Sequence, residues 1–214
     1  MNDTTPTISL VSAFSTPFAF FENKELNSPL IDLILSKKTK GIDSNVAVDF
    51  KHNLVESKFD FLNQENDITN KTKNWFNDCM KYAINSLNNE IIDYKVTYKE
   101  SWFHITTTNG MHESHWHPNC SWCGIYYLQS GDEGVGGDTV FENPYKSVNI
   151  DQGSRYLHDD SVFRVTPKDG TLVLFPSHIS HYQAIYKGVQ DRIVVAFNSV
   201  VYPKEEVGTI NNER

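Results

Sequence analysis

The chain has 214 residues, a length that fits a single domain with a sizeable core. Its formal net charge of −8 argues against a general affinity for nucleic-acid phosphates, and no apolar run approaches the roughly 20 residues that cross a bilayer. The first residues lack the basic and apolar regions of a secretory signal, and three cysteines are an odd count that favours a reducing compartment. We therefore expect a cytoplasmic protein without nucleic-acid or membrane partners.

The first 92 residues predict a helical preface that packs on the rest of the fold. One helix is expected at about 28–38, where Ser28 can cap it, Pro29 suits its first turn and apolar residues recur at helical spacing. A second helix is expected at about 70–89. Its predicted apolar side is formed by Phe76, Cys79, Met80, Ala83 and Leu87.

From residue 93 the hydrophobic pattern changes to a period of two, which is typical of strands. In "YKVTYKESWFHITT", we expect Val96, Tyr98, Trp102 and His104 to share one face. Further strands are predicted in "WCGIYYLQ", "DTVFE", "VFRVT", "TLVLF" and "DRIVVAFNSV". Many short strands after a helical preface predict a mainly β fold, a jelly-roll or cupin-like barrel over residues 93–202, with a tail at 203–214.

The stretch "HESHWHPNC", residues 112–120, concentrates metal-ligand chemistry in nine positions. In an extended strand, residues i and i+2 point to the same face, so His115 and His117 would bring two imidazoles together. Pro118 then ends the strand, which places the pair at a strand end, where barrels usually hold their ligands. The alternative is a solvent-facing histidine cluster in a loop.

A second group of candidates lies far downstream, after the apolar strand "TLVLF". His178 and His181 follow it, and a ligand from such a remote strand would complete a facial metal site with open coordination positions. Arg192 opens "RIVVAFN", and an arginine inside a barrel requires a carboxylate partner, typically in a bidentate pair. A surface arginine at a strand start is the alternative.

Tyr126 and Tyr127 occupy adjacent positions in the strand "GIYYLQ", so they point to opposite faces. One of them therefore faces the interior, where a phenol can donate a hydrogen bond to a bound carboxylate. Ordinary strand packing is the alternative for either residue.

In this order, the motifs resemble the 2-oxoglutarate- and Fe(II)-dependent oxygenases of the prolyl-4-hydroxylase-like superfamily, especially a small bacterial and phage branch. That branch has a pattern like H-x-H-P-x-S-x-x-S-G-V-Y-Y-L, then G-x-L-V-L-F-P-S-x-x-x-H and R-x-x-x-x-F-N. This chain reads "HWHPNCSWCGIYYL", "GTLVLFPSHISH" and "RIVVAFN". The likeness covers about residues 44–199, and the order and spacing of the separated motifs make it specific.

The resemblance implies a double-stranded β-helix and a dioxygenase that hydroxylates an unactivated C–H bond and releases succinate and CO2. It implies Fe(II) and 2-oxoglutarate as cofactors, with ascorbate as the reductant in an assay. His115 and His181 would bind the iron, Arg192 and Tyr127 the distal carboxylate of 2-oxoglutarate, and Asn198 would lie at the cofactor site. The implied partner is an amino acid, a peptide or a small metabolite, and the oligomeric state stays open, a homodimer included.

One position departs from the family pattern, which has an aspartate two residues after the first histidine. Here that residue is His117, and a register that begins at His117 places Asn119 in the same slot. We hypothesise that His115, His117 and His181 form a three-imidazole facial set. The alternatives for the third ligand are Asn119, Glu113 and Asp138.

Cys120 and Cys123 lie beside these histidines, and two thiols with two imidazoles are a ligand set of structural zinc. Strand alternation would send the two thiols to opposite faces, so we expect them to be small buried or half-buried hydrophobes instead. Two other classes of function remain as alternatives: a non-catalytic cupin-like binding module and a zinc-stabilised interaction protein.

Overall fold

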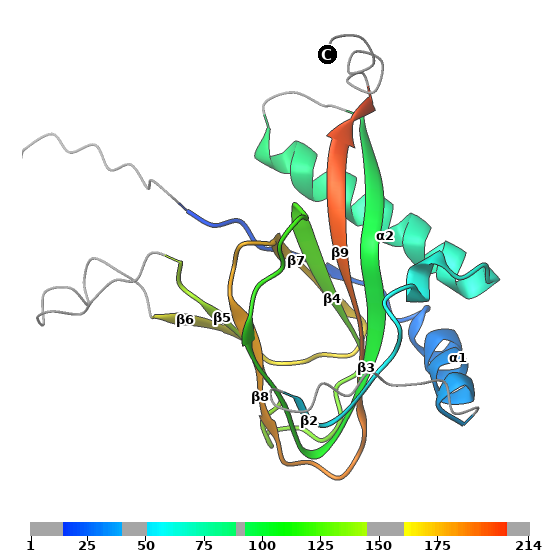
Figure 1. The fold of residues 1–214 in the computed structure, drawn as a ribbon, viewed down its shortest axis with the longest axis vertical. Coiled ribbons are helices and arrows are strands. Elements are labelled where there is room, and N and C mark those ends of the chain that lie inside the picture. The colour runs from blue at the N-terminus through cyan, green and yellow to red at the C-terminus, as the bar shows by residue number, and fades with distance from the viewer. Residues whose placement is uncertain (1–14, 40–50, 89–92, 145–160, 205–214) are drawn as a thin grey trace, which may run out of the picture.

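The computed structural model describes residues 15–39, 51–88, 93–144 and 161–204 (Figure 1). The strands of the described residues form one antiparallel sheet in the order β1-β7-β4-β9-β3-β8-β5-β6, with β2 paired to β3. The sheet curls into a half-open barrel, and the two helices lie along its outer side (Figure 1). The elements are β1 (Ala19–Glu22), α1 (Asn27–Thr39), β2 (Lys51–Glu56), η1 (Phe61–Asn63), α2 (Asp67–Leu87), β3 (Tyr94–His115), β4 (Trp122–Gln129), β5 (Thr139–Glu142), β6 (Val162–Val165), β7 (Thr171–Pro176), β8 (His181–Tyr186) and β9 (Arg192–Pro203).

Both predicted helices are present, with shifted ends. Helix α2 begins three residues before the predicted start because the side chain of Asn66 accepts a hydrogen bond from the Ile68 N–H at 2.9 Å and caps the helix. Four of the five residues on its predicted apolar side are buried, but Leu87, the last residue of the helix, is exposed. Leu30 and Ile34 are buried and form the apolar face of α1.

Helix α2 covers the outer face of the sheet through aromatic contacts. The Phe76 ring lies 4.9 Å from Phe197 of β9 and 5.6 Å from Tyr126 of β4, measured between ring centroids. Tyr126 therefore faces the helices, and its neighbour Tyr127 faces the interior of the curled sheet. Burial of such rings contributes about 1.5–3 kcal/mol per side chain, which fixes the helices to the sheet.

The side chains of the long strand β3 switch from one face of the sheet to the other at a β-bulge. The register between β3 and β9 shifts between Tyr98 and Glu100, where one extra residue enters the ladder. A one-residue shift reverses which face the following side chains point to. Tyr98 consequently packs in the core under the helices, whereas Trp102 and His104 line the interior cavity. The prediction that these residues share one face was wrong, because the sequence pattern does not reveal the bulge.

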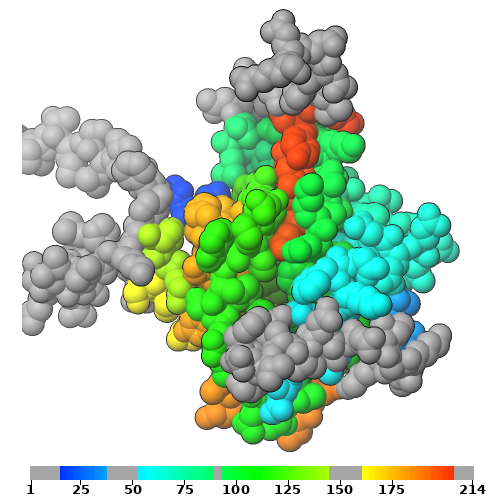
Figure 2. Space-filling view, in the orientation of Figure 1, coloured from blue at the N-terminus to red at the C-terminus, as the bar shows by residue number. Residues whose placement is uncertain are grey.

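The segment before residue 93 contributes strands as well as helices. Strand β1 pairs with β7, and β2 pairs with β3. The central strands β3 (green) and β9 (red) lie side by side in the space-filling view (Figure 2). Neither helix of the described residues combines the length and the apolar character that crossing a membrane requires.

Candidate metal centre

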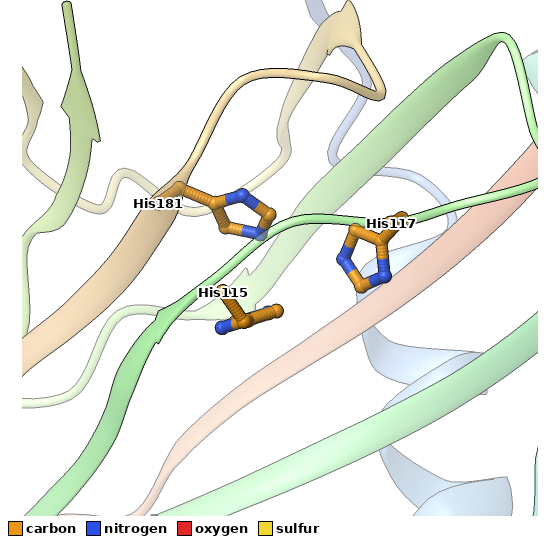
Figure 3. Close-up of side chains that lie close together, drawn as sticks. All are labelled: His115, His117 and His181. Carbon is orange, nitrogen blue, oxygen red and sulfur yellow. The ribbon is translucent and has the colours of Figure 1, made fainter.

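Three histidines from two remote parts of the sequence meet inside the curled sheet. His115 is the last residue of β3, His117 follows two residues later, and His181 is the first residue of β8. Strands β3 and β8 pair so that His115 stands opposite His181. One ligand nitrogen from each ring lies within 4.8 Å of the others, and Figure 3 shows the three rings around a common centre. This spacing allows one ion to contact all three imidazoles.

The position of His117 depends on a loop and not on a strand. Its backbone N–H donates to the carbonyl oxygen of Ser177 at 3.2 Å, and the Ser177 N–H donates to the carbonyl oxygen of Ser121 at 3.1 Å. The Ser177 hydroxyl donates to the carbonyl oxygen of Cys120 at 2.7 Å. These bonds join the loop after His115 to the segment before His181, so the two sides of the histidine cluster are linked.

Two of the rings are oriented by backbone carbonyls. The Nδ1 atom of His115 lies 2.7 Å from the carbonyl oxygen of Glu113, and Nδ1 of His181 lies 3.0 Å from that of Ile179. A carbonyl oxygen only accepts, so each Nδ1 carries the proton and each Nε2 offers a lone pair. Burial lowers the pKa of His181 well below its ordinary value, and the nearby His115 adds to this shift. His181 is therefore kept in the neutral form that binds metals.

No carboxylate joins the three histidines within the described part of the chain. The Glu113 side chain is exposed, and only its backbone oxygen contacts His115. Asn119 is exposed and occupies a left-handed turn with φ of 59°. Of the four candidates for a third ligand, including Asp138, the structure brings only His117 to the cluster.

The histidines line a pocket that is partly open to solvent, and the empty space within it, open solvent included, is about 480 Å³. Its floor is formed by β9, flanked by β3 and β4, whose side chains stand in register across the sheet. Thr106 is paired with Arg192 at one end, and Trp102 is paired with Ala196 near the other end. These β3–β9 residue pairs succeed one another along the sheet. The cavity therefore runs from Arg192 inside the barrel to the residues around His117.

Arg192 is 2% exposed and closes the inner end of the cavity. Its Nη1 donates to Oε1 of Gln183 at 2.6 Å, and its Nε has no hydrogen-bond partner. No ion pair joins Arg192 to a carboxylate in the described ranges. Burial lowers the pKa of Arg192 from its ordinary value, while nearby Tyr127 and Asp138 raise it. A buried cation with an unused donor fits an anionic ligand.

Tyr127 packs beside Arg192, and Asn198 lines the cavity near its other end. The Tyr127 ring faces Arg192, with the guanidinium carbon 5.4 Å from the ring centroid. Its hydroxyl donates to Thr139 Oγ1 at 2.7 Å, and burial raises its pKa. Asn198 lies beside His117, with Nδ2 3.2 Å from the His117 Nδ1 atom. Asn198 is therefore a neighbour of the histidine cluster and not of the arginine.

Several cavity residues were not identified from the sequence. Gln183 follows His181 by two positions in β8, so the same alternation that selects His181 would have found it. The Glu56 carboxylate lies 2.6 Å from Nε2 of His104, and both side chains are buried. No sequence signal connects that pair, because the β2–β3 register contains irregularities. His112 stacks on His115 at 4.0 Å between ring centroids.

Cys120, in the loop, and Cys123, in β4, lie outside the histidine cluster. Contrary to the expectation of opposite faces, the Cys120 and Cys123 thiols interact, because Cys120 precedes β4 and is not bound by strand alternation. The Cys123 thiol lowers the pKa of Cys120 to about 7, although burial acts against this shift. Cys123 donates to Oδ1 of Asn198 at 3.2 Å.

Comparison with known proteins identifies the class to which this arrangement corresponds. Residues 100–198 match the model of a family described as "Putative 2OG-Fe(II) oxygenase", which is 99 of the 214 residues. No curated protein sequence matches the chain. The predicted resemblance to 2-oxoglutarate- and Fe(II)-dependent oxygenases is thus confirmed, and the matched stretch includes the three histidines, Arg192 and Asn198.

Solved structures share the fold at low sequence identity. A prolyl-4-hydroxylase from Pseudomonas putida aligns with a TM-score of 0.59 and 13% identity, covering 87% of this chain and 94% of that one. A Trichoplax adhaerens prolyl hydroxylase in complex with a hypoxia inducible factor peptide fragment gives 0.56 and 14%, covering 92% and 87%. HygX from Streptomyces hygroscopicus, with nickel, 2-oxoglutarate and hygromycin B bound, gives 0.53 and 11%, covering 88% and 84%. The predicted double-stranded β-helix fold is confirmed.

Proposed function

We propose that this protein is a 2-oxoglutarate- and Fe(II)-dependent dioxygenase that hydroxylates an unactivated C–H bond and releases succinate and CO2. One observation carries the proposal. A single cavity has three imidazoles that converge near one end and a buried arginine at the other, which no carboxylate of the described residues pairs with. The family match over residues 100–198 supports the same activity.

The donor set fits a divalent iron ion. Imidazole is a suitable ligand for iron, and three facial nitrogens leave coordination positions open for a cosubstrate and dioxygen. His115 and His181 already present their Nε2 lone pairs, and His117 completes the set. Three neutral ligands leave more positive charge on the ion than two histidines and a carboxylate do. An anionic cosubstrate is therefore held more strongly by this centre.

The inner end of the cavity fits the distal carboxylate of 2-oxoglutarate. Arg192 offers Nε, which has no partner, beside the Nη1 group that Gln183 orients. Tyr127 packs its ring against the guanidinium, and Thr139 holds the tyrosine hydroxyl. A charge-assisted contact of this kind is worth about 1.5–3 kcal/mol. These residues bind and orient the cosubstrate with its other end toward the histidines.

The bound iron and 2-oxoglutarate supply the oxidising chemistry, and the protein supplies geometry and exclusion of water. Apolar side chains on the cavity lining, including Phe175, Val194 and Ala196, keep water from the space between the histidines and Arg192. Asn198 lies against His117, so it influences the metal end and not the carboxylate end.

For the substrate we propose an amino acid, a peptide or a small metabolite. Two neighbours in fold are recorded with such molecules, a peptide fragment and hygromycin B. In this chain, Trp102 lines the cavity near His117, and its buried indole N–H has no hydrogen-bond partner. A carbonyl or hydroxyl oxygen of a substrate would satisfy that donor.

The experiment is an anaerobic titration of the metal-free protein with Fe(II) and then 2-oxoglutarate. A visible charge-transfer band that requires both additions is the expected result, followed by succinate release when air and ascorbate are admitted with a library of amino acids, peptides and metabolites. The Arg192→Ala variant should still bind Fe(II) but require far more 2-oxoglutarate. Exposed Arg164 offers a matched control, Arg164→Ala, that should behave as the wild type.

The same titration separates the other two classes. A non-catalytic binding module would bind metal and give no charge-transfer band with 2-oxoglutarate. A zinc-stabilised interaction protein would copurify with zinc and unfold when a chelator removes it. Either result would reject the dioxygenase.

A further inference from the structure

Asn198 is held in one orientation by two neighbours. Its Nδ2 donates to Oε2 of Glu100 at 2.8 Å, and its Oδ1 accepts a hydrogen bond from the Cys123 thiol at 3.2 Å. The same Nδ2 lies 3.2 Å from Nδ1 of His117. Asn198 is 3% exposed, so the amide has no water-filled surroundings in which to turn freely.

The Glu100 contact decides which end of the amide faces His117. A carboxylate only accepts hydrogen bonds, so the amide end beside Glu100 is the NH2 group. Reversing the amide would set its oxygen against the carboxylate oxygen at hydrogen-bond distance. Because Nδ2 has two hydrogens, one goes to Glu100 and the second points at His117. Nδ1 of His117 must then accept.

This reverses the tautomer of His117 relative to its two partners. A neutral imidazole has one N–H, so a ring that accepts at Nδ1 carries its proton on Nε2. His115 and His181 face backbone carbonyls through Nδ1 and therefore carry their protons there. The nitrogen of His117 that is not beside Asn198 faces the other two rings (Figure 3). Two rings thus present lone pairs to the centre, and the third presents an N–H.

We propose that Asn198, held by Glu100, is a positioning residue that keeps His117 in the Nε2–H tautomer until a metal binds. His117 becomes a ligand only when the amide of Asn198 turns over, which breaks its bond to Glu100 and moves the imidazole proton to Nδ1. The inference rests on the proposed metal site and adds to it that Glu100, although acidic, opposes metal binding. Outer groups that orient a ligand histidine commonly change metal affinity 10–100-fold.

The first test reads the tautomers directly in metal-free, 15N-labelled protein. Long-range 1H–15N correlation spectra distinguish Nδ1–H from Nε2–H rings, and the loss of a signal in the His117→Gln variant assigns that ring. We expect Nε2–H for His117 and Nδ1–H for His115 and His181. An Nδ1–H pattern for His117 would overturn the proposal.

The second test uses Zn²⁺ alone as the probe and Glu100→Ala as the variant. Glu100 is exposed, so its removal leaves the fold intact. Freed of the carboxylate, the amide turns over more readily, so the His117 signal should shift toward Nδ1–H and Zn²⁺ should bind about three- to tenfold more tightly. The exposed Glu113 supplies a matched control: Glu113→Ala removes an equal charge near the site and should leave zinc affinity equal or weaker.

These outcomes are independent of catalysis. Unchanged spectra and equal or weaker zinc binding in Glu100→Ala would overturn the role of Asn198 and leave the dioxygenase proposal standing. A missing charge-transfer band with Fe(II) and 2-oxoglutarate would reject the dioxygenase while the tautomer spectra still decide the role of Asn198.

Discussion

The two ends of the cavity are built in different ways. At the inner end, Arg192, Gln183 and Thr106 belong to paired strands, and the Gln183 side chain accepts hydrogen bonds from both of the others. At the histidine end, His115 ends β3, His181 begins β8, and His117 lies in the loop between β3 and β4. Strand pairing fixes the arginine end, whereas His117 is held by loop contacts and lies against Asn198.

The largest expected effect is at the metal end. His181→Ala should weaken Fe(II) or Zn²⁺ binding by roughly 10²- to 10³-fold, since a set of four zinc ligands contributes about 10–16 kcal/mol in all. The matched control is His178→Ala, which removes an exposed histidine three residues earlier in the same segment. Anaerobic metal titration of both variants measures the difference. Equal affinities would mean that the ion binds elsewhere.

Part of the site could be predicted from the sequence, and part depends on how the strands pair. His115, His117, His181 and Arg192 could be proposed as site residues because ligand-type residues at the ends of strands stand out by their spacing. Gln183 and Thr139 did not stand out, because polar residues are common in strands and only the register shows which of them meet. The bulge between Tyr98 and Glu100 was also hidden, since an inserted residue leaves no compositional signal.

The strands between the two ends carry the buried Glu56–His104 pair. The second largest expected effect is the loss of stability when this pair is broken. Glu56→Ala removes the acceptor of a buried histidine N–H, so we expect the free energy of unfolding to fall by about 2–4 kcal/mol. Glu56→Gln keeps an acceptor and should lose less than half as much. Urea denaturation of the metal-free proteins measures both. If Glu56→Ala lowers the free energy of unfolding by less than breaking the exposed ion pair Lys168–Glu22 does, the buried pair does not stabilise the fold.

At the inner end, Arg192→Lys tests whether the fork of the guanidinium matters beyond its charge. Lysine keeps the cation but loses the second donor, so 2-oxoglutarate should bind about 10- to 150-fold more weakly, which corresponds to about 1.5–3 kcal/mol. Metal affinity should stay within about twofold, because Arg192 is not among the clustered ligands. Isothermal titration of 2-oxoglutarate into the metal-loaded variant measures the first value. Unchanged binding would place the cosubstrate elsewhere and remove the contrast between the two ends.

The smallest expected effect separates two adjacent tyrosines. Tyr127→Phe deletes the hydrogen bond to Thr139 at the inner end, and Tyr126→Phe deletes the hydroxyl contacts to Asn23 and Asn27 under the helices. Each should lower the free energy of unfolding by about 1 kcal/mol, because each removes one hydroxyl donor. Only Tyr127→Phe should weaken 2-oxoglutarate binding, by about two- to fivefold, since its ring packs on Arg192 and its hydroxyl fixes that ring. Equal cosubstrate affinity in the two variants would show that Tyr127 packs beside the arginine without holding it in place.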